Sequence, residues 1–304
     1  MRSSIQGWAR LGIVHSMAFP HAVESTEAYL STVTEILKDP FFEVVELGNP
    51  PFAELIEMVP PLVDQAACTL TYCGHGLLFG SGANINSLDE TERARAVAIL
   101  KEGIDEAYAM GSEEFQFLSR HWEEGKEDAY LDALIRSTKE LCAYAASKGD
   151  MPVVLEVFDH NIDKKSLLGP AVLVARYAEA VRAEWENFGI MIDCSHIPII
   201  GESIDEAVDP IVQYITHVHI GNAFLSDPEH PSYGDYHPRF EYPGGENDTA
   251  YLAAFLQKLV DIGYLSEGGR KILSFEVKPQ EGEDSSMVVA GSKRILERAW
   301  RMVT

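Results

Sequence analysis

Positive charge is scarce in this sequence. Its 304 residues hold 24 Lys and Arg against 48 Asp and Glu, which gives a formal net charge of −24. A negative field of this size repels phosphate backbones and anionic membrane surfaces, and it favours neutral or cationic ligands. We therefore expect no nucleic acid and no membrane as a partner, although acidity by itself specifies no partner.

Cysteines and long apolar runs are also scarce. No apolar run is long enough to span a bilayer, and no two cysteines form a C-x-x-C pair; the four are Cys68, Cys73, Cys142 and Cys194. The first residues, MRSSIQGWARLGIVH, lack the apolar core and the cleavage site of a signal peptide. We expect reduced thiols and a cytoplasmic protein.

Short β-branched runs alternate with longer amphipathic segments along the whole chain. Strands are predicted at 11–15, 42–48, 68–75, 115–121, 152–158, 189–196, 215–222 and 272–277. Helices are predicted at 24–38, 87–110, 128–149, 169–189 and 248–264. Ser87 with Glu90 suggests a capping box, and Gly189 suggests a helix end. Eight strand-then-helix units within one domain's length predict a single α/β domain over residues 1–304, a (β/α)8 TIM barrel.

Four of the predicted strands end in a side chain that can bind a metal. The runs VVLE, IMID, HVHI and LSFE end at Glu156, Asp193, His219 and Glu276. The alternation of apolar positions points these side chains inward, and the carboxyl ends of barrel strands meet at one mouth. Three carboxylates and an imidazole suit an oxygen-preferring divalent cation that keeps a position open for substrate. The sequence therefore predicts a metalloenzyme.

Other histidines end or follow predicted strands and are candidates for substrate contact. His15, His75 and His121 end the first, third and fourth strands, and His196 follows Asp193 by three residues. Polar groups that converge on one mouth cost desolvation energy unless a metal or substrate satisfies them. His217 has the same inward parity as His219 one layer deeper, where a histidine that orients the ligand is expected.

The stretch at 222–247 is too long and too rich in turns for a simple connection. Segments of this kind often form lids or binding loops. Its side chains His230, Asp235, His237 and Arg239 would lie over the metal. Two interpretations stay open, substrate contact by His237 or Arg239 and a purely structural loop.

The segments LEVFD, MIDCSH, THVHIGN, PGGENDTAYLAAFLQKLVDIGY and LSFEVKP resemble the xylose isomerase-like TIM-barrel superfamily of sugar isomerases and epimerases. The resemblance implies that Glu156, Asp193, His219 and Glu276 bind one divalent cation, Mn²⁺ in the first place and Mg²⁺, Co²⁺ or Zn²⁺ as alternatives. It also implies that Glu156 and Glu276 form the acid/base pair, that His196 binds a substrate oxygen, and that the protein is a homo-oligomer.

The function implied is isomerisation or epimerisation of a small carbohydrate, a keto-sugar or an inosose. A carboxylate would remove the proton α to a carbonyl while the cation stabilises the enediolate. One position departs from the resemblance. Ketose epimerases of this superfamily carry a second glutamate six residues after the first ligand, and Ile162 stands there in this chain.

Three other functions fit parts of the pattern. A lyase of the C-glycoside deglycosidase type would use the same four ligands on 3-keto-glycosides and would need a small β-rich partner chain. An abasic-site DNA endonuclease would use three zinc ions on a larger set, namely His75, His121, Glu156, Asp193, His196, His219, Asp235, His237 and Glu276. The negative charge and the lack of basic clusters disfavour the endonuclease. A non-catalytic barrel would be expected to have lost a ligand.

Overall fold

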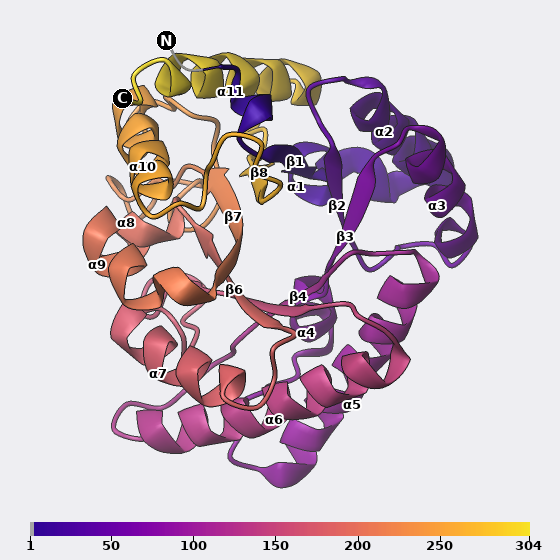
Figure 1. Cartoon of the computed structure of the whole chain (residues 1–304), viewed down its shortest axis with the longest axis vertical. Coiled ribbons are helices and arrows are strands. Elements are labelled where there is room, and N and C mark those ends of the chain that lie inside the picture. Colours follow the sequence, from indigo (N-terminus) through magenta and orange to yellow (C-terminus); the bar gives the residue numbers. More distant parts are fainter. Residues whose placement is uncertain (1–2) are drawn as a thin grey trace.

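Eight parallel strands close into one barrel in the part of the chain that the computed structural model describes, residues 3–304 (Figure 1). Each strand pairs with its neighbours in sequence, and β8 pairs with β1. This confirms the predicted (β/α)8 fold, and the strands overlap all eight predicted runs. They are β1 Arg10–Val14, β2 Val44–Gly48, β3 Thr69–Cys73, β4 Phe115–Leu118, β5 Val153–Glu156, β6 Phe188–Asp193, β7 Ile215–Gly221 and β8 Ile272–Glu276.

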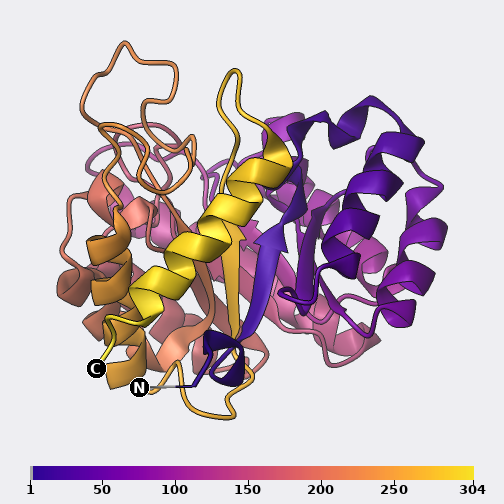
Figure 2. The same ribbon diagram turned by 90° about the horizontal axis from the view of Figure 1, so that it is seen from above.

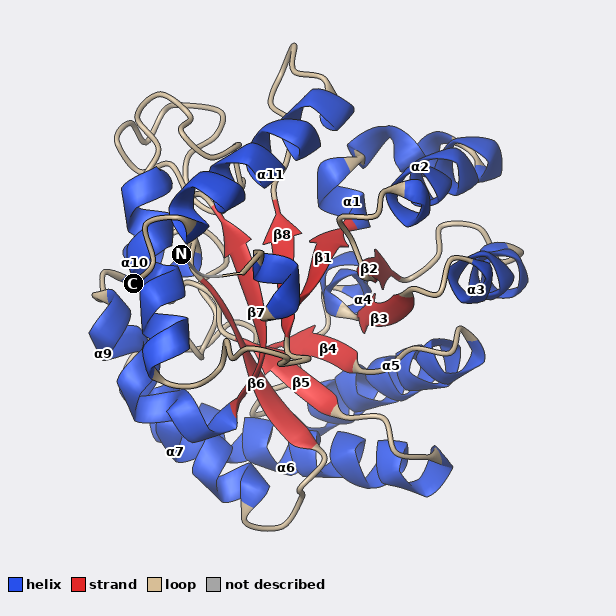
Figure 3. Ribbon diagram, turned by 45° about the horizontal axis from the view of Figure 1, so that its top comes forward, coloured by secondary structure: helices blue, strands red, loops and turns tan. Residues whose placement is uncertain are grey.

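Helices surround this barrel on its outside (Figure 3). The five predicted helices are present as α2 Thr26–Lys38, α5 Glu90–Ala109, α6 Glu127–Lys148, α7 Ala171–Arg182 and α10 Thr249–Asp261. Six α-helices were not predicted: α1 His15–Ala18, α3 Leu55–Gln65, α4 His75–Ser81, α8 His196–Ile200, α9 Ile204–Val208 and α11 Ser285–Trp300. Within residues 3–304, no helix is both long enough and apolar enough to cross a membrane.

Two local predictions about helix ends are wrong. The N-cap of α5 is Asp89, whose carboxylate accepts the N–H groups of Thr91 and Glu92, so Ser87 and Glu90 form no capping box. Gly189 lies inside β6 instead of ending a helix. A Cβ at Gly189 would lie 2.0 Å from Thr216 Oγ1, so this glycine lets β6 approach β7 closely.

The strand register brings the predicted metal ligands to one level of the barrel. Asp193 on β6 pairs with His219 on β7, and Gly221 on β7 pairs with Glu276 on β8. His217 is two residues deeper and pairs with Met191 and Ile272. Because side chains alternate along a strand, His217 and His219 both point into the barrel, in successive layers.

The segment between β7 and α10 carries only isolated bridges, from Phe224 to Gly234 and to Gly245. Figure 2 shows this orange segment rising on the side toward which the β1 arrow points, beside the yellow connection that follows β8. Both segments therefore lie at the carboxyl ends of the strands, where the ligands are.

Candidate metal centre

Glu156, Asp193, His219 and Glu276 lie together at the carboxyl ends of four adjacent strands. Each offers one ligand atom, and these atoms all lie within 4.8 Å of one another. Nδ1 of His219 is 2.8 Å from Glu276 Oε2 and 3.5 Å from Glu156 Oε1. All four side chains are almost completely shielded from solvent. The structure thus brings together the four residues that the strand pattern singles out.

Two oxygen atoms of this group are buried and accept no hydrogen bond from residues 3–304. They are Glu156 Oε1 and Asp193 Oδ2. A buried carboxylate oxygen without a donor is costly unless a cation satisfies it. Burial also raises the pKa of Asp193 to about 6 in the metal-free protein, because the charged form lacks solvation. Oxygen atoms with no donor, next to an imidazole nitrogen, fit a divalent cation.

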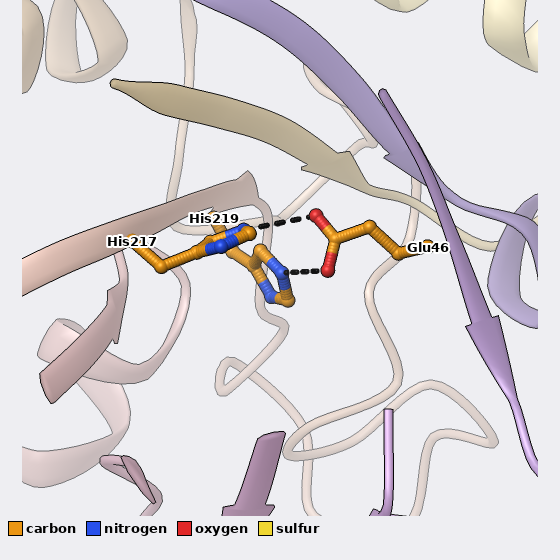
Figure 4. Close-up of side chains that lie close together, drawn as sticks. All are labelled: Glu46, His217 and His219. Atoms are coloured by element: carbon orange, nitrogen blue, oxygen red, sulfur yellow. Dashed lines mark hydrogen bonds and ion pairs between the residues drawn. The ribbon is translucent and has the colours of Figure 1, made fainter. Parts of the chain in front are cut away.

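A second cluster of charged side chains lies directly below, in the barrel interior. Glu46 on β2 places Oε1 2.9 Å from His217 Nε2 and Oε2 3.1 Å from His219 Nε2 (Figure 4). His217 Nδ1 lies 2.5 Å from Glu114 Oε1. The Gln116 amide donates to both carboxylates, at 2.9 Å each. Every charged group of this lower cluster therefore has a partner.

The lower cluster carries one positive charge between two negative ones. Burial lowers the pKa of His217, but Glu46 and Glu114 outweigh burial and raise this pKa to about 9. Burial raises the pKa of Glu46, but His217 and His219 outweigh it and hold the pKa well below its usual range. The prediction that His217 is a buried neighbour of His219 agrees with this geometry. Glu46, although it lies near the end of the predicted strand 42–48, was missed as its partner.

His196 and His237 share one carboxylate beside the metal ligands. Their Nε2 atoms lie 2.9 Å and 2.7 Å from the same atom, Asp235 Oδ1. His196 Nδ1 is 2.7 Å from the Val157 carbonyl, and Asp193, His196 and His237 also offer ligand atoms within 4.8 Å. His237 has φ +48°, and a Cβ at Gly221 would lie 2.8 Å from its Nδ1. A strained backbone and a glycine thus hold His237 against the site.

A cavity of about 540 Å³ opens above these side chains. Glu156, His219 and Glu276 line its floor, and His75 Nε2 lies 3.1 Å from Glu156 Oε2. The remaining wall is polar on one part, with His75, Asp163, Lys164, Asp235, His237 and Lys278, and apolar on another, with Val14, Met17, Val23, Phe79 and Phe158. This size falls within the range of pockets that enclose small ligands.

Two lysines of the cavity wall were not predicted as site residues. Lys164 Nζ lies 2.7 Å from Asp163 Oδ2 and 3.1 Å from Asp235 Oδ2. Burial lowers the pKa of Lys164, but Asp235 and then Asp163 outweigh burial and raise it. Lys278 Nζ lies 5.3 Å from the centre of the Tyr236 ring, and no carboxylate of residues 3–304 forms an ion pair with it. Each lysine follows a ligand-bearing strand, which was the signal available in the sequence.

The segment after β5, which contains Ile162, is folded around one carboxylate. The Asp159 carboxylate accepts the N–H groups of Ile162, Asp163 and Lys164 at 2.8, 2.9 and 2.6 Å. This side chain folds the segment into a tight loop and directs Lys164 toward the cavity. A lysine ammonium thus faces the cavity from the segment that contains Ile162.

Four residues predicted to contact substrate do not line the cavity: His15, His121, His196 and Arg239. His15 begins α1 and is buried, with Nε2 2.8 Å from Thr32 Oγ1 and its ring edge-on to Tyr29. His121 is exposed on the surface. Arg239 pairs its Nε with Glu283 Oε1 at 2.8 Å, outside the cavity. The predicted strands that end at His15 and His121 pass into a helix and an irregular segment, which turn these side chains away, and Arg239 lies in the long segment after β7. We leave His15, His121 and Arg239 out of the proposed contacts, whereas His196 contacts the cavity residue Asp235.

Comparison with known proteins identifies the family of this chain. The family model described as "Xylose isomerase-like TIM barrel" matches residues 41–294. No curated protein matches the sequence. Among solved structures, the chain is similar to D-psicose 3-epimerase from Clostridium cellulolyticum H10, with a TM-score of 0.68 and 17% identity over 97% of this chain and 99% of that one.

Two further solved structures show how widely the fold is used. One is 3-keto-D-glucoside 4-epimerase from E. coli, with a TM-score of 0.66 and 15% identity over 94% of this chain and 98% of that one. The other is an AP endonuclease, family 2, from Brucella melitensis, with a TM-score of 0.66 and 18% identity over 91% and 95%. At such identities these similarities show the shared fold alone.

Proposed function

The chain belongs to the xylose isomerase-like TIM barrel family, and from that premise we propose that it is a divalent-metal-dependent isomerase or epimerase of a keto-sugar or an inosose-type substrate. The observation that carries the proposal is the group of four candidate ligands, three of which, Glu156, His219 and Glu276, line the floor of the cavity. Within this group Glu156 Oε1 and Asp193 Oδ2 accept no hydrogen bond from residues 3–304. Sugar epimerases among the structures of similar fold support the same reaction class.

Glu156, Asp193, His219 and Glu276 would hold one divalent cation, with Mn²⁺ as our first choice. When bound, such a cation polarises a carbonyl and stabilises the negative charge that develops on its oxygen after proton loss. The four ligands would also fix the position of the cation, and thereby the position of the reacting carbons of the substrate.

We assign the acid/base chemistry to Glu156 and Glu276. They end β5 and β8, so the two carboxylates approach the substrate space from different sides of the barrel mouth. One carboxylate would take the proton from the carbon next to the carbonyl, and return of a proton from the other side would invert that centre. Return to the neighbouring carbon would give the isomer.

The substrate contacts follow from the cavity wall. His75, His237 and Lys278 face the cavity, and His196 supports the wall through Asp235. The N–H groups and the ammonium donate to hydroxyl and carbonyl oxygens, which is what a sugar offers. We propose that segment 222–247 acts as a lid, because it supplies Asp235, Tyr236 and His237 to the same wall.

A lyase acting on 3-keto-glycosides is the second candidate. It uses the same proton abstraction, followed by loss of the group on the neighbouring carbon. The apolar part of the cavity, at Val14, Met17 and Phe79, favours it because this surface suits an aglycone. This function would require a partner chain, whereas the isomerase would be expected to form a homo-oligomer.

Deuterium exchange separates these functions. The Mn²⁺-loaded protein is incubated in D₂O with free ketoses, inososes and 3-keto-glycosides, and label and products are followed by mass spectrometry and NMR. Deuterium at an α-carbon without cleavage supports the isomerase or epimerase, and release of the aglycone supports the lyase. Failure of both, with nicking of abasic-site DNA, would overturn the proposal. The cytoplasmic location remains a prediction.

A further inference from the structure

We propose that Glu46 is a positioning residue for the metal centre. It accepts the Nε2–H of His219 and thereby directs the other ring nitrogen, Nδ1, toward the carboxylates at the strand ends. This inference rests on the proposed metal site, and it concerns a residue that is not one of the four proposed ligands.

Glu46 reaches His219 from a distant part of the barrel. It lies on β2, whose partners in the sheet are β1 and β3, whereas His219 lies on β7. The side chain crosses the barrel interior and is fully buried. It does not line the cavity, so it acts on substrate only through another group.

Both oxygen atoms of Glu46 are held by donors other than His219. Oε1 lies 2.9 Å from His217 Nε2, and Oε2 accepts from the Gln116 amide at 2.9 Å. The orientation of that amide is itself fixed, because Cys73 Sγ donates to its oxygen at 2.9 Å. The carboxylate therefore presents Oε2 to His219 Nε2 from a fixed position, 3.1 Å away.

A carboxylate can accept a hydrogen bond and has no proton to donate. In the metal-free protein both ring nitrogens of His219 face carboxylates, Nε2 at Glu46 and Nδ1 at Glu276, so each carries a hydrogen. Glu276 is a proposed ligand and Glu46 is not, so a bound cation would replace the hydrogen on Nδ1 while Glu46 keeps the hydrogen on Nε2. Nδ1 is the atom that lies 2.8 Å from Glu276 Oε2 and 3.5 Å from Glu156 Oε1. Without Glu46, the ring could place its hydrogen on Nδ1 and donate to Glu276, which would block ligation.

The chain offers a matched control for this role. Glu114 is also a carboxylate of the lower cluster, and it contacts His217 and Gln116 as Glu46 does. It does not contact His219. Glu46→Gln and Glu114→Gln therefore make the same chemical change within one network, and they differ in whether the metal-binding histidine loses its acceptor.

The test measures Mn²⁺ binding by the full-length, metal-stripped protein, without substrate, by calorimetry and by the EPR signal of free Mn²⁺. Glu46→Gln should weaken binding about 10- to 100-fold, the loss typical when a partner of a ligating histidine is removed. Glu114→Gln should bind within about threefold of the unmodified protein, because His219 keeps its acceptor. Thermal melting establishes that both variants are folded.

A spectroscopic measurement decides the question even if Glu46→Gln does not fold. In the unmodified protein loaded with Zn²⁺ and labelled with ¹⁵N-histidine, His219 should carry its hydrogen on Nε2 and bind the metal through Nδ1. A hydrogen on Nδ1, or equal Mn²⁺ affinity in Glu46→Gln and the unmodified protein, would overturn the role of Glu46 alone. Failure of the unmodified protein to bind Mn²⁺ would instead overturn the proposed metal site, and this role with it.

Discussion

Two polar layers occupy the same barrel, and they differ in how their hydrogen bonds are satisfied. In the lower layer, His217 contacts both Glu46 and Glu114, so each negative charge faces a positive one. In the upper layer, Glu156 and Asp193 each keep an oxygen that accepts no hydrogen bond from residues 3–304. The upper layer faces a cavity and the lower layer does not. Buried charges with complete partners need no further group, whereas buried carboxylate oxygens without donors fit a bound cation.

The largest expected effect is on catalysis, at the upper layer. Glu156→Gln and Glu276→Gln should each reduce α-carbon deuterium exchange about 10³-fold or more, since each variant removes a base and weakens the metal site. Mass spectrometry of substrate recovered from D₂O measures this. Glu283→Gln, which removes a half-buried carboxylate outside the cavity, serves as the control and should exchange normally. Near-normal exchange in either cavity variant would remove that glutamate from the acid/base role.

The next effect is on stability, at the lower layer. His217→Leu leaves Glu46 and Glu114 buried without the cation between them, which should lower the free energy of unfolding by about 3 kcal/mol. The pKa of His217 is raised from 6.5 to about 9 in the folded protein, so its stabilisation is complete below pH 6.5 and is lost as the pH rises through 9. Urea unfolding of the metal-free protein at several pH values measures both effects.

Asp193→Asn provides the upper-layer counterpart of that experiment. It removes a buried carboxylate whose pKa is already raised, while an amide oxygen can still accept the Ser195 N–H. The metal-free variant should therefore be no less stable than the unmodified protein at pH 7, although it should lose the stabilisation by Mn²⁺. A loss of several kcal/mol in Asp193→Asn would abolish the distinction between the two layers.

The fold was predictable because its signals are local. Each strand is a short β-branched run, and the polar residue at its end marks the carboxyl end of the barrel, as at Glu156 and Asp193. Helix α3 was not predicted, because Pro60 and Pro61 within it suggest a break. In the folded chain its buried residues Leu55, Val59 and Val63 outweigh that preference.

The site was only partly predictable because contacts across the barrel leave no local signal. The four candidate ligands can be predicted from the ends of the strands and from the alternation of inward and outward side chains, and both are visible in a single sequence. Glu46 and His219 are 173 residues apart in the sequence, and no local pattern around either residue predicts their contact. The strand-end rule also selected His15, which the chain turns outward because α1 begins at this residue.

A smaller effect is expected on substrate affinity, at the cavity lysine Lys278. Lys278→Met should raise KM about tenfold with a small change in kcat, because a charged donor to a substrate oxygen contributes about 1.5–3 kcal/mol. Steady-state kinetics with the substrate identified by exchange measures this. Lys271→Met replaces an exposed lysine just before β8 and should leave KM unchanged. An unchanged KM in Lys278→Met would show that this ammonium does not bind substrate.

The smallest effect concerns His15, a buried histidine outside both layers. Burial, and to a lesser extent His21, lowers its pKa from 6.5 to about 3, so the unfolded chain binds a proton there that the folded chain does not. Stability should consequently fall as the pH falls from 6.5 toward 3, by about 1 kcal/mol between pH 6.5 and 5.5 from this residue. His15→Gln should remove this part of the pH dependence in urea unfolding while exchange activity at pH 7 stays within about twofold. His15 is buried against Thr32 and Tyr29, away from the cavity. A large loss of exchange activity in a folded His15→Gln protein would therefore contradict this assignment and support the original prediction that His15 contacts substrate.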